Sequence, residues 1–254
     1  MAYQVDLVFR EIPGNLKNES IGYRYQLTID PASSRPTRNL PMLTIHHLGK
    51  SQSERIIWLC EELGLPYDLK HYPRDPVTIL SPPELKALHP LGAAPVITDE
   101  GLMLAESGAI VQYIIAKHGQ DRLAPGTTDP DFAPYLYWFH FANANLQSHM
   151  GRNMILRRLN LAADNPTLLA TQGRLDQALE LVEARLGEVN YLAGQAFSAA
   201  DIMTVFSLTT MRHFLPLDLA PYPHILDYLQ RIGRRAAYQR AMRRGDPELT
   251  PLLT

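Results

Sequence analysis

The chain has 254 residues, of which 46% are hydrophobic and 20% charged, and its formal net charge is −2. This composition is typical of a globular protein with a sizeable core, and it excludes nucleic acid or an anionic membrane as the main partner on electrostatic grounds. No apolar run approaches the ~18 residues of a membrane helix, and the first residues do not follow a secretory signal pattern. The single cysteine excludes an internal disulfide, so we expect a cytoplasmic protein.

Residues 1–41 differ in pattern from the rest of the chain. Two strand-like segments, 3–9 and 23–29, are followed by a polar, proline-bearing run over residues 31–41. Neither segment provides enough apolar surface for a core of its own. We therefore treat residues 1–41 as an N-terminal extension of unknown role.

Residues 42–121 alternate between strand and helix patterns. Helices are expected to begin near Ser51, Ser81 and Ser107, and strands are expected at residues 43–47, 68–72, 95–98 and 102–104. The resulting order, β-α-β-α-β-β-α, predicts a mixed sheet with helices on its faces.

Serine residues mark the expected starts of these helices. Ser51 precedes Glu54 by three residues, which is a capping-box pattern, and Gly64 provides a left-handed stop for the same helix. Ser107 is expected to cap the third helix, which ends at Gly119.

The second half of the chain lacks strand patterns. Residues 121–131 are rich in Pro, Gly and Asp and are predicted to link two domains. Ser198 and Asp201, preceded by Phe197, form a helix-start pattern. We therefore predict an all-α domain over residues 132–247, with helices at 135–146, 175–186, 202–211, 223–232 and 236–243.

Several short segments carry a resemblance to a known family. Residues 42–119 resemble the thioredoxin-like half of cytosolic glutathione transferases, and Ser198–Ile202 is similar to the capping motif of that family's helical domain. The segments that carry the resemblance are SQSER (51–55), WLCEELGLPY (58–67), PELK (83–86), HPLG (89–92), APVI (94–97) and AESGAI (105–110). The similarity is strongest to the serine-type, theta-like branch found in fungi and bacteria.

The resemblance implies an enzyme with a two-part fold: a thioredoxin-like α/β domain over residues 42–121 and an all-α domain that contributes an electrophile pocket. The implied activity is a detoxifying glutathione S-transferase reaction, in which the glutathione thiol is activated as a thiolate. Ser51 would then hydrogen-bond the thiolate at a helix N-terminus, which favours anions. The alternatives are that Ser51 is only a helix cap, or that Ser53 holds the sulfur. Lys50 could add a positive charge near the sulfur, the alternative being a solvated loop lysine.

The resemblance also assigns the rest of the glutathione site. Glu106 and Ser107 would bind the γ-glutamyl end, with the helix N–H groups and the Ser107 hydroxyl on the carboxylate and Glu106 on the ammonium. Pro95 would follow a cis peptide bond, which turns the backbone of Ala94 toward the cysteinyl residue of glutathione.

One position departs from the family pattern. Ala93 stands where relatives often carry a lysine, arginine or glutamine that meets the glycyl carboxylate, so Arg74 or Lys86 would have to replace it.

Cys60 falls on the apolar face of its helix, which indicates core packing rather than thiol chemistry. His46 and His47 point to opposite faces of a strand, and no histidine spacing fits a metal, so we expect no metal cofactor.

Three functions remain open at this point. They are glutathione conjugation to a small hydrophobic electrophile, glutathione-dependent peroxide or disulfide reduction on the same fold, and a non-catalytic interaction module. The resemblance further implies a homodimer. The aromatic stripe that includes Tyr135, Trp138 and Phe139 is expected to be mainly core, with one or two members at the electrophile pocket.

Overall fold

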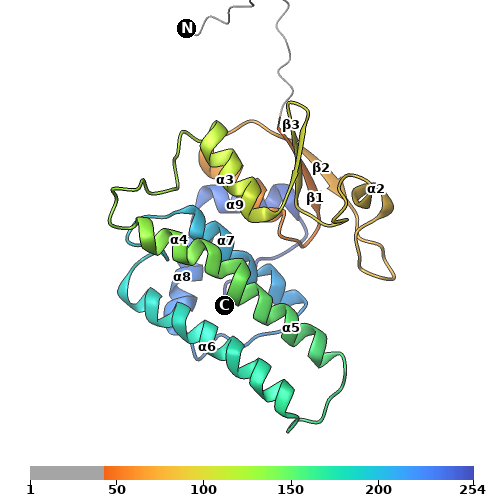
Figure 1. The fold of residues 1–254 in the computed structure, drawn as a ribbon, viewed down its shortest axis with the longest axis vertical. Coiled ribbons are helices and arrows are strands. Elements are labelled where there is room, and N and C mark those ends of the chain that lie inside the picture. The colour runs from red at the N-terminus through yellow and green to blue at the C-terminus, as the bar shows by residue number, and fades with distance from the viewer. Residues whose placement is uncertain (1–42) are drawn as a thin grey trace, which may run out of the picture. The chain divides into compact units, whose positions relative to one another are not determined.

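The computed structural model of the protein describes residues 43–254 (Figure 1). The predicted N-terminal extension, with its strand-like segments at 3–9 and 23–29, lies outside the described residues. Within residues 43–254, no helix is both long enough and apolar enough to cross a membrane.

A four-stranded mixed sheet has the order β2-β1-β3-β4. β1 (Thr44–Leu48) runs parallel to β2 (Asp68–Tyr72), whereas β3 (Val96–Asp99) is antiparallel to both β1 and β4 (Leu102–Ala105). The predicted order β-α-β-α-β-β-α is therefore confirmed.

The register of the sheet brings three chain segments to one end of it. Val96, the first residue of β3, pairs with His46 near the end of β1 and with Ala105 at the end of β4. The segments after β1, before β3 and after β4 therefore lie next to each other.

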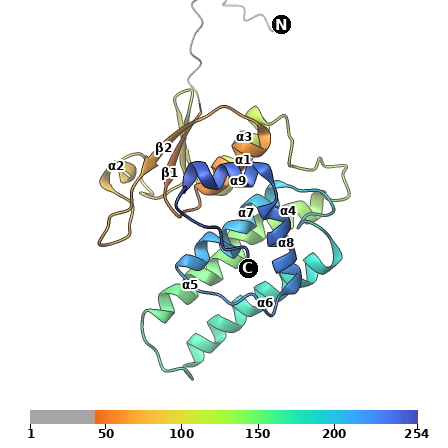
Figure 2. The ribbon, with the colours of Figure 1, turned by 180° about the vertical axis from the view of Figure 1, so that it is seen from behind.

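Helices cover both faces of the sheet (Figures 1 and 2). Ile45 points to the face on which α1 (Glu54–Leu63) and α3 (Ser107–His118) pack. Leu48 points to the other face and forms a small cluster with Leu85 of α2 (Pro83–Lys86). Gly64 ends α1 in the left-handed conformation, as predicted (φ 64°).

All regular elements after β4 are helical within the described residues, which confirms the all-α character of this part. Its elements are α4 (Phe132–Phe141), the π-helix η1 (Ala142–Gln147), α5 (Ser148–Arg157), α6 (Pro166–Glu188), α7 (Ala199–Leu208), the 3-10 helix η2 (Thr210–His213), α8 (Pro223–Gly233) and α9 (Ala236–Gly245). The helix predicted at 135–146 is part of a longer run, because α4, η1 and α5 follow one another without a break.

The predicted capping motif at Ser198 is present. Ser198 caps α7, and the Asp201 side chain accepts the Ser198 backbone N–H at 2.9 Å. Asp201 is fully buried and also accepts hydrogen bonds from the Leu192 N–H and the Tyr228 hydroxyl, both at 3.0 Å. One carboxylate thus joins the start of α7 to α8 and to the loop before α7.

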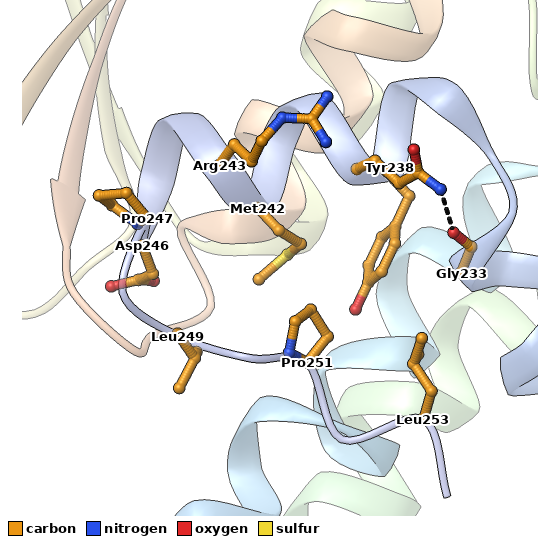
Figure 3. A pocket seen from close by; sticks show the side chains of 10 residues that line it. Gly233, Tyr238, Met242, Arg243, Asp246, Pro247, Leu249, Pro251 and Leu253 are labelled. Atoms are coloured by element: carbon orange, nitrogen blue, oxygen red, sulfur yellow. Dashed lines mark hydrogen bonds between the residues drawn. The ribbon is translucent and has the colours of Figure 1, made fainter.

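The last helix, α9, lies against the first helix, α1. α9 packs along α1, where Arg235 donates to Glu62 at 2.7 Å and Arg240 donates to Glu61 at 2.7 Å (Figure 2). Asp246, directly after α9 (Figure 3), accepts the Lys50 backbone N–H at 3.0 Å, so the end of this helix lies close to the segment that joins β1 to α1.

Candidate functional site

The candidate residues taken from the sequence meet at one end of the sheet. Ser51 follows β1, the Ala94–Pro95 bond precedes β3, and Glu106 and Ser107 follow β4. The Ala94–Pro95 peptide bond is cis, as expected. The register of the strands is the reason for this convergence, since the three segments leave or enter the sheet side by side.

The segment between β1 and α1 does not form the predicted capping box. α1 begins at Glu54, and the Ser51 hydroxyl instead lies 2.7 Å from the Ser53 hydroxyl. Glu54 accepts a hydrogen bond from the Thr210 hydroxyl at 2.6 Å rather than from the Ser51 backbone. Ser51 is 7% exposed and Ser53 is 0% exposed. Of the two serines, only Ser51 can touch a ligand.

Ser107 is also not the cap of its helix. It is the first residue of α3, and its buried hydroxyl donates to Gln52 Oε1 at 3.1 Å and accepts from Arg55 Nη1 at 3.2 Å and Asn143 Nδ2 at 3.1 Å. The prediction failed because tertiary partners occupy the hydroxyl. The backbone N–H groups of the first turn of α3 have no acceptors within the helix.

Glu106 has a strained backbone and an exposed side chain. Its φ of 71° lies in the left-handed region, which a residue with a Cβ rarely adopts. Such strain is concentrated at functional sites. Glu106 borders a pocket of about 410 Å³, whose other lining residues are Gly108, Ala109, Gln112, Phe139, His140, Asn143, Ala144 and Met203.

Arg55 is a central residue that sequence reasoning missed. It is fully buried and donates to Gln52 Oε1 at 2.7 Å, Asn143 Oδ1 at 2.9 Å and Gln147 Oε1 at 2.9 Å. Burial lowers its pKa to about 9, and the charge of Glu54 opposes that effect. Asn143 and Gln147 both belong to the π-helix η1, a rare element that is frequent at functional sites.

His47 and Asp246 were also missed. His47 Nδ1 lies 2.8 Å from the Ser53 hydroxyl, and its Nε2 lies 3.4 Å from Asp246 Oδ2. Asp246 also accepts the Lys50 backbone N–H at 3.0 Å. The sequence did predict that His46 and His47 face opposite sides, and His46 indeed contacts Tyr72 on the other face. No local pattern indicated a partner almost 200 residues away.

The two substitutes suggested for the residue missing at Ala93 differ in their surroundings. Arg74 donates to the carbonyl oxygens of Gly49 at 2.7 Å, Lys50 at 3.0 Å and Ile79 at 2.8 Å, so it braces the loop after β1. Lys86 is exposed, and its Cγ would lie 3.4 Å from a Cβ placed on Gly92, next to Ala93. Lys86 is the freer of the two cations.

Cys60 is buried in the main core, as predicted. Burial raises the pKa of its thiol to about 12, so thiol chemistry at this position is disfavoured. Residues 43–254 hold no group of three or more His, Cys, Asp or Glu side chains placed to bind a metal ion. The aromatic residues Tyr135 and Trp138 are core, while Phe139 also reaches the pocket beside Glu106.

Most of the chain matches the two domains of one known family. Residues 33–122 match the glutathione S-transferase N-terminal domain, and residues 137–236 match the C-terminal domain. Glutathione S-transferase 1 of Saccharomyces cerevisiae is 30% identical over 224 residues, which cover 79% of this chain and 94% of the relative. Glutathione S-transferase 3 of Schizosaccharomyces pombe is 29% identical over 212 residues, with coverages of 77% and 85%.

Solved structures agree with these matches. A glutathione S-transferase from Actinobacillus pleuropneumoniae has a TM-score of 0.74 and 32% identity, with 81% of this chain and 93% of that chain covered. A glutathione transferase family member from Pseudomonas fluorescens, solved with two glutathione molecules bound, has a TM-score of 0.67, with coverages of 82% and 95%. At 19% identity the second likeness concerns the fold alone.

Proposed function

The chain belongs to the glutathione S-transferase family, and from this premise we propose that it activates the glutathione thiol as a thiolate at Ser51 for attack on a small hydrophobic electrophile. The observation that carries the proposal is the meeting of Ser51, the cis Ala94–Pro95 bond and the strained Glu106 at one end of the sheet. These three segments are distant in sequence, and each supplies a different part of a peptide-binding site.

Ser51 is proposed to contact the sulfur. It lies three residues before the start of α1, where the positive end of the helix dipole favours an anion. A free thiol titrates near ~8.5, so a hydrogen bond to the thiolate together with this dipole would increase the thiolate fraction at neutral pH. Ser51 is the accessible member of the hydroxyl pair that it forms with Ser53.

The γ-glutamyl end is proposed to bind at the start of α3. Backbone N–H groups of Ser107 and the next residues would bind the α-carboxylate, while exposed Glu106 would pair with the ammonium. The Ser107 hydroxyl already has three partners, so its proposed role is to hold Gln52 and Arg55 in place beside the carboxylate. Arg55 adds a buried positive charge 3.2 Å from that hydroxyl.

The cysteinyl and glycyl parts of glutathione are assigned to residues of the chain segment before β3. The backbone of Ala94, turned by the cis bond to Pro95, would pair with the cysteinyl residue as an added strand does. Lys86 is proposed to meet the glycyl carboxylate, because Arg74 is engaged by three carbonyl oxygens. We also propose a cytoplasmic homodimer and the domain boundaries 42–121 and 132–247, with no metal cofactor.

The first test is calorimetric titration with reduced glutathione, using Glu106→Gln and, as a matched control, Glu100→Gln. Both residues are exposed, and Glu100 lies in the β3–β4 turn, away from the proposed site. We expect binding in the micromolar to low millimolar range, about −4 to −8 kcal/mol. Loss of one charge-assisted bond, about 1.5–3 kcal/mol, should weaken binding at least tenfold in Glu106→Gln and leave Glu100→Gln unchanged.

A second measurement separates the candidate activities. Conjugation of a chromogenic electrophile should fall about 10²-fold in Ser51→Ala, as it does when an enzyme loses one donor to a developing anion. A rate of glutathione-dependent peroxide reduction above that of conjugation would favour the reductase alternative. Absence of glutathione binding at about 10 mM would contradict the transferase proposal and favour a non-catalytic module.

A further inference from the structure

Four side chains form a continuous line from the proposed sulfur position into the protein. The Ser51 and Ser53 hydroxyls are 2.7 Å apart, and the Ser53 hydroxyl is 2.8 Å from His47 Nδ1. On the far side of the ring, His47 Nε2 lies 3.4 Å from Asp246 Oδ2. Ser53 and His47 are fully buried, so Ser51 is the outer end of this line.

The neighbours of the line determine where its hydrogens lie. A carboxylate facing Nε2 requires a hydrogen on that nitrogen, so Nδ1 of a neutral His47 is an acceptor. Ser53 then donates to Nδ1 at 2.8 Å rather than to the more distant Leu48 carbonyl oxygen at 3.4 Å, while its oxygen accepts the Leu48 backbone N–H at 3.2 Å and the hydrogen of Ser51. In this state the Ser51 hydrogen points inward, and its oxygen offers a lone pair to a ligand.

The same heavy atoms fit a second state, in which every hydrogen has moved one place. His47 is then an imidazolium that donates from Nδ1 to Ser53, Ser53 donates to Ser51, and the hydrogen of Ser51 points outward. This second state is the one that donates a hydrogen bond to a thiolate. The two states differ by one proton, and that proton resides on His47.

We propose that His47, held by Asp246, is the acceptor of the glutathione thiol proton, which reaches it through Ser51 and Ser53. The S–H bond of glutathione and the O–H bonds of the two serines break, while new O–H bonds at both serines and an N–H bond at His47 Nδ1 form. The products are a thiolate and an imidazolium, so the net charge is unchanged. This inference rests on the proposed binding of glutathione at Ser51.

The Ser53–His47–Asp246 part has the composition of a hydrolytic triad, but the geometry excludes that function. Ser53 is 0% exposed, and its oxygen is surrounded by the Ser51 hydroxyl, the His47 ring and the Leu48 backbone. No electrophile can reach it. The line can therefore transmit a proton but cannot make a covalent bond to a substrate.

The contact between His47 and Asp246 is built into the packing. A Cβ on Gly49 would lie 3.0 Å from Asp246 Oδ1, and a Cβ on Gly245 would lie 3.4 Å from His47 Nε2 and 3.0 Å from Ile57. Two glycines thus make room for the ring and the carboxylate to meet. His47 Nε2 is buried and lacks a well-formed hydrogen bond, so a charged ring would gain by closing the 3.4 Å gap.

The surrounding charges suit a proton on His47. The contact with His47 and the Lys50 N–H outweigh burial and lower the pKa of Asp246, so it is ionised. Burial and the adjacent His47 lower the pKa of His71, whose ring is 5.3 Å away, so it does not compete as a second cation. Glu54, with a pKa raised to about 8 by burial, is largely protonated at neutral pH. The cations that face Asp246 are Lys50 and Arg74.

The experiment counts protons. Glutathione is titrated calorimetrically in buffers of different ionisation enthalpy, which gives the protons released on binding, and the ultraviolet absorption of the thiolate gives the amount formed. S-methylglutathione, which has no thiol proton, corrects for every other ionisation. The variants are His47→Asn, which keeps a hydrogen-bond partner for Ser53 but cannot hold the extra proton, and the matched control His46→Gln on the opposite face of β1.

We expect the wild type and His46→Gln to release almost no protons per thiolate formed, and His47→Asn to release roughly one, because the proton must then enter the solvent. Asp246→Asn removes the counter-charge of His47 and should shift the proton release in the same direction, which provides a test if His47→Asn does not fold. Release of about one proton per thiolate by the wild type would overturn the relay. So would an unchanged count in a folded His47→Asn. Absence of glutathione binding would instead refute the proposed function itself.

Discussion

Glu54 makes the stability of the protein depend on pH in a direction opposite to that of most carboxylates. It lies in the first turn of α1, is 5% exposed, and accepts a hydrogen bond from Thr210 at 2.6 Å. Burial raises its pKa from 4.5 to about 8; the Thr210 hydrogen bond opposes this shift, and the nearby Asp246 charge adds to it. The folded state therefore retains a proton that the unfolded chain loses near pH 4.5.

The size of the effect follows from this shift. The stability associated with protonated Glu54 is fully present below pH 4.5 and is lost as pH rises through about 8. Between pH 7 and pH 9 the folded state loses most of one proton at Glu54 while the unfolded state loses none. Integration over this window gives a loss on the order of 1 kcal/mol, a change of about tenfold in the folding equilibrium.

The assay is urea unfolding of wild type and Glu54→Gln at pH 7 and pH 9, at one protein concentration. Glutamine keeps an acceptor for Thr210 and cannot ionise, so its stability should fall less than that of the wild type over this window. We expect the difference in free energy of unfolding between the two proteins to change by on the order of 1 kcal/mol in favour of the variant at pH 9. An unchanged difference, or a change in favour of the wild type, would contradict a pKa near 8 for Glu54 in the folded protein.

Two further predictions concern the core. Asp201→Ala leaves the buried N–H groups of Leu192 and Ser198 and the Tyr228 hydroxyl without their acceptor, so the free energy of unfolding should fall by about 3–5 kcal/mol in urea titrations. A loss below about 1 kcal/mol would contradict the view that this carboxylate joins α7 to α8. Cys60, whose thiol pKa burial raises to about 12, should resist thiol reagents in the folded protein at pH 8 and react fully in denaturant. Rapid stoichiometric labelling of the native protein would refute that expectation.

Local patterns predicted those parts of the fold whose cause is local. The left-handed stop at Gly64 and the capping box of Ser198 and Asp201 depend on a few neighbouring residues, and both are present. The alternation of His46 and His47 across β1 follows from strand geometry alone and is also correct. The cis bond before Pro95 was expected from family resemblance rather than from any local pattern.

The same reasoning failed where other side chains, near or distant in sequence, compete for a serine hydroxyl. Ser51 and Ser107 both have the sequence context of helix caps, but Ser53 binds the first hydroxyl and Gln52, Arg55 and Asn143 bind the second. A cap contributes only about 1 kcal/mol, so buried tertiary hydrogen bonds outweigh it. The structure brings the candidate site residues to one end of the sheet, but their hydrogen-bond partners could not be predicted from the sequence.

The contact of Asp246 with the Lys50 backbone spans 196 residues, and it relates the candidate site to the timing of synthesis. At 5–20 residues per second, a ribosome needs about 10–40 s to add that length of chain. During this interval the nascent β1–α1 loop lacks the carboxylate that holds both Lys50 and His47. A nascent chain can therefore contain every segment of the proposed glutathione site while its β1–α1 loop still lacks the support of α9 and Asp246. We expect activity to appear only after α9 and Asp246 have been synthesised.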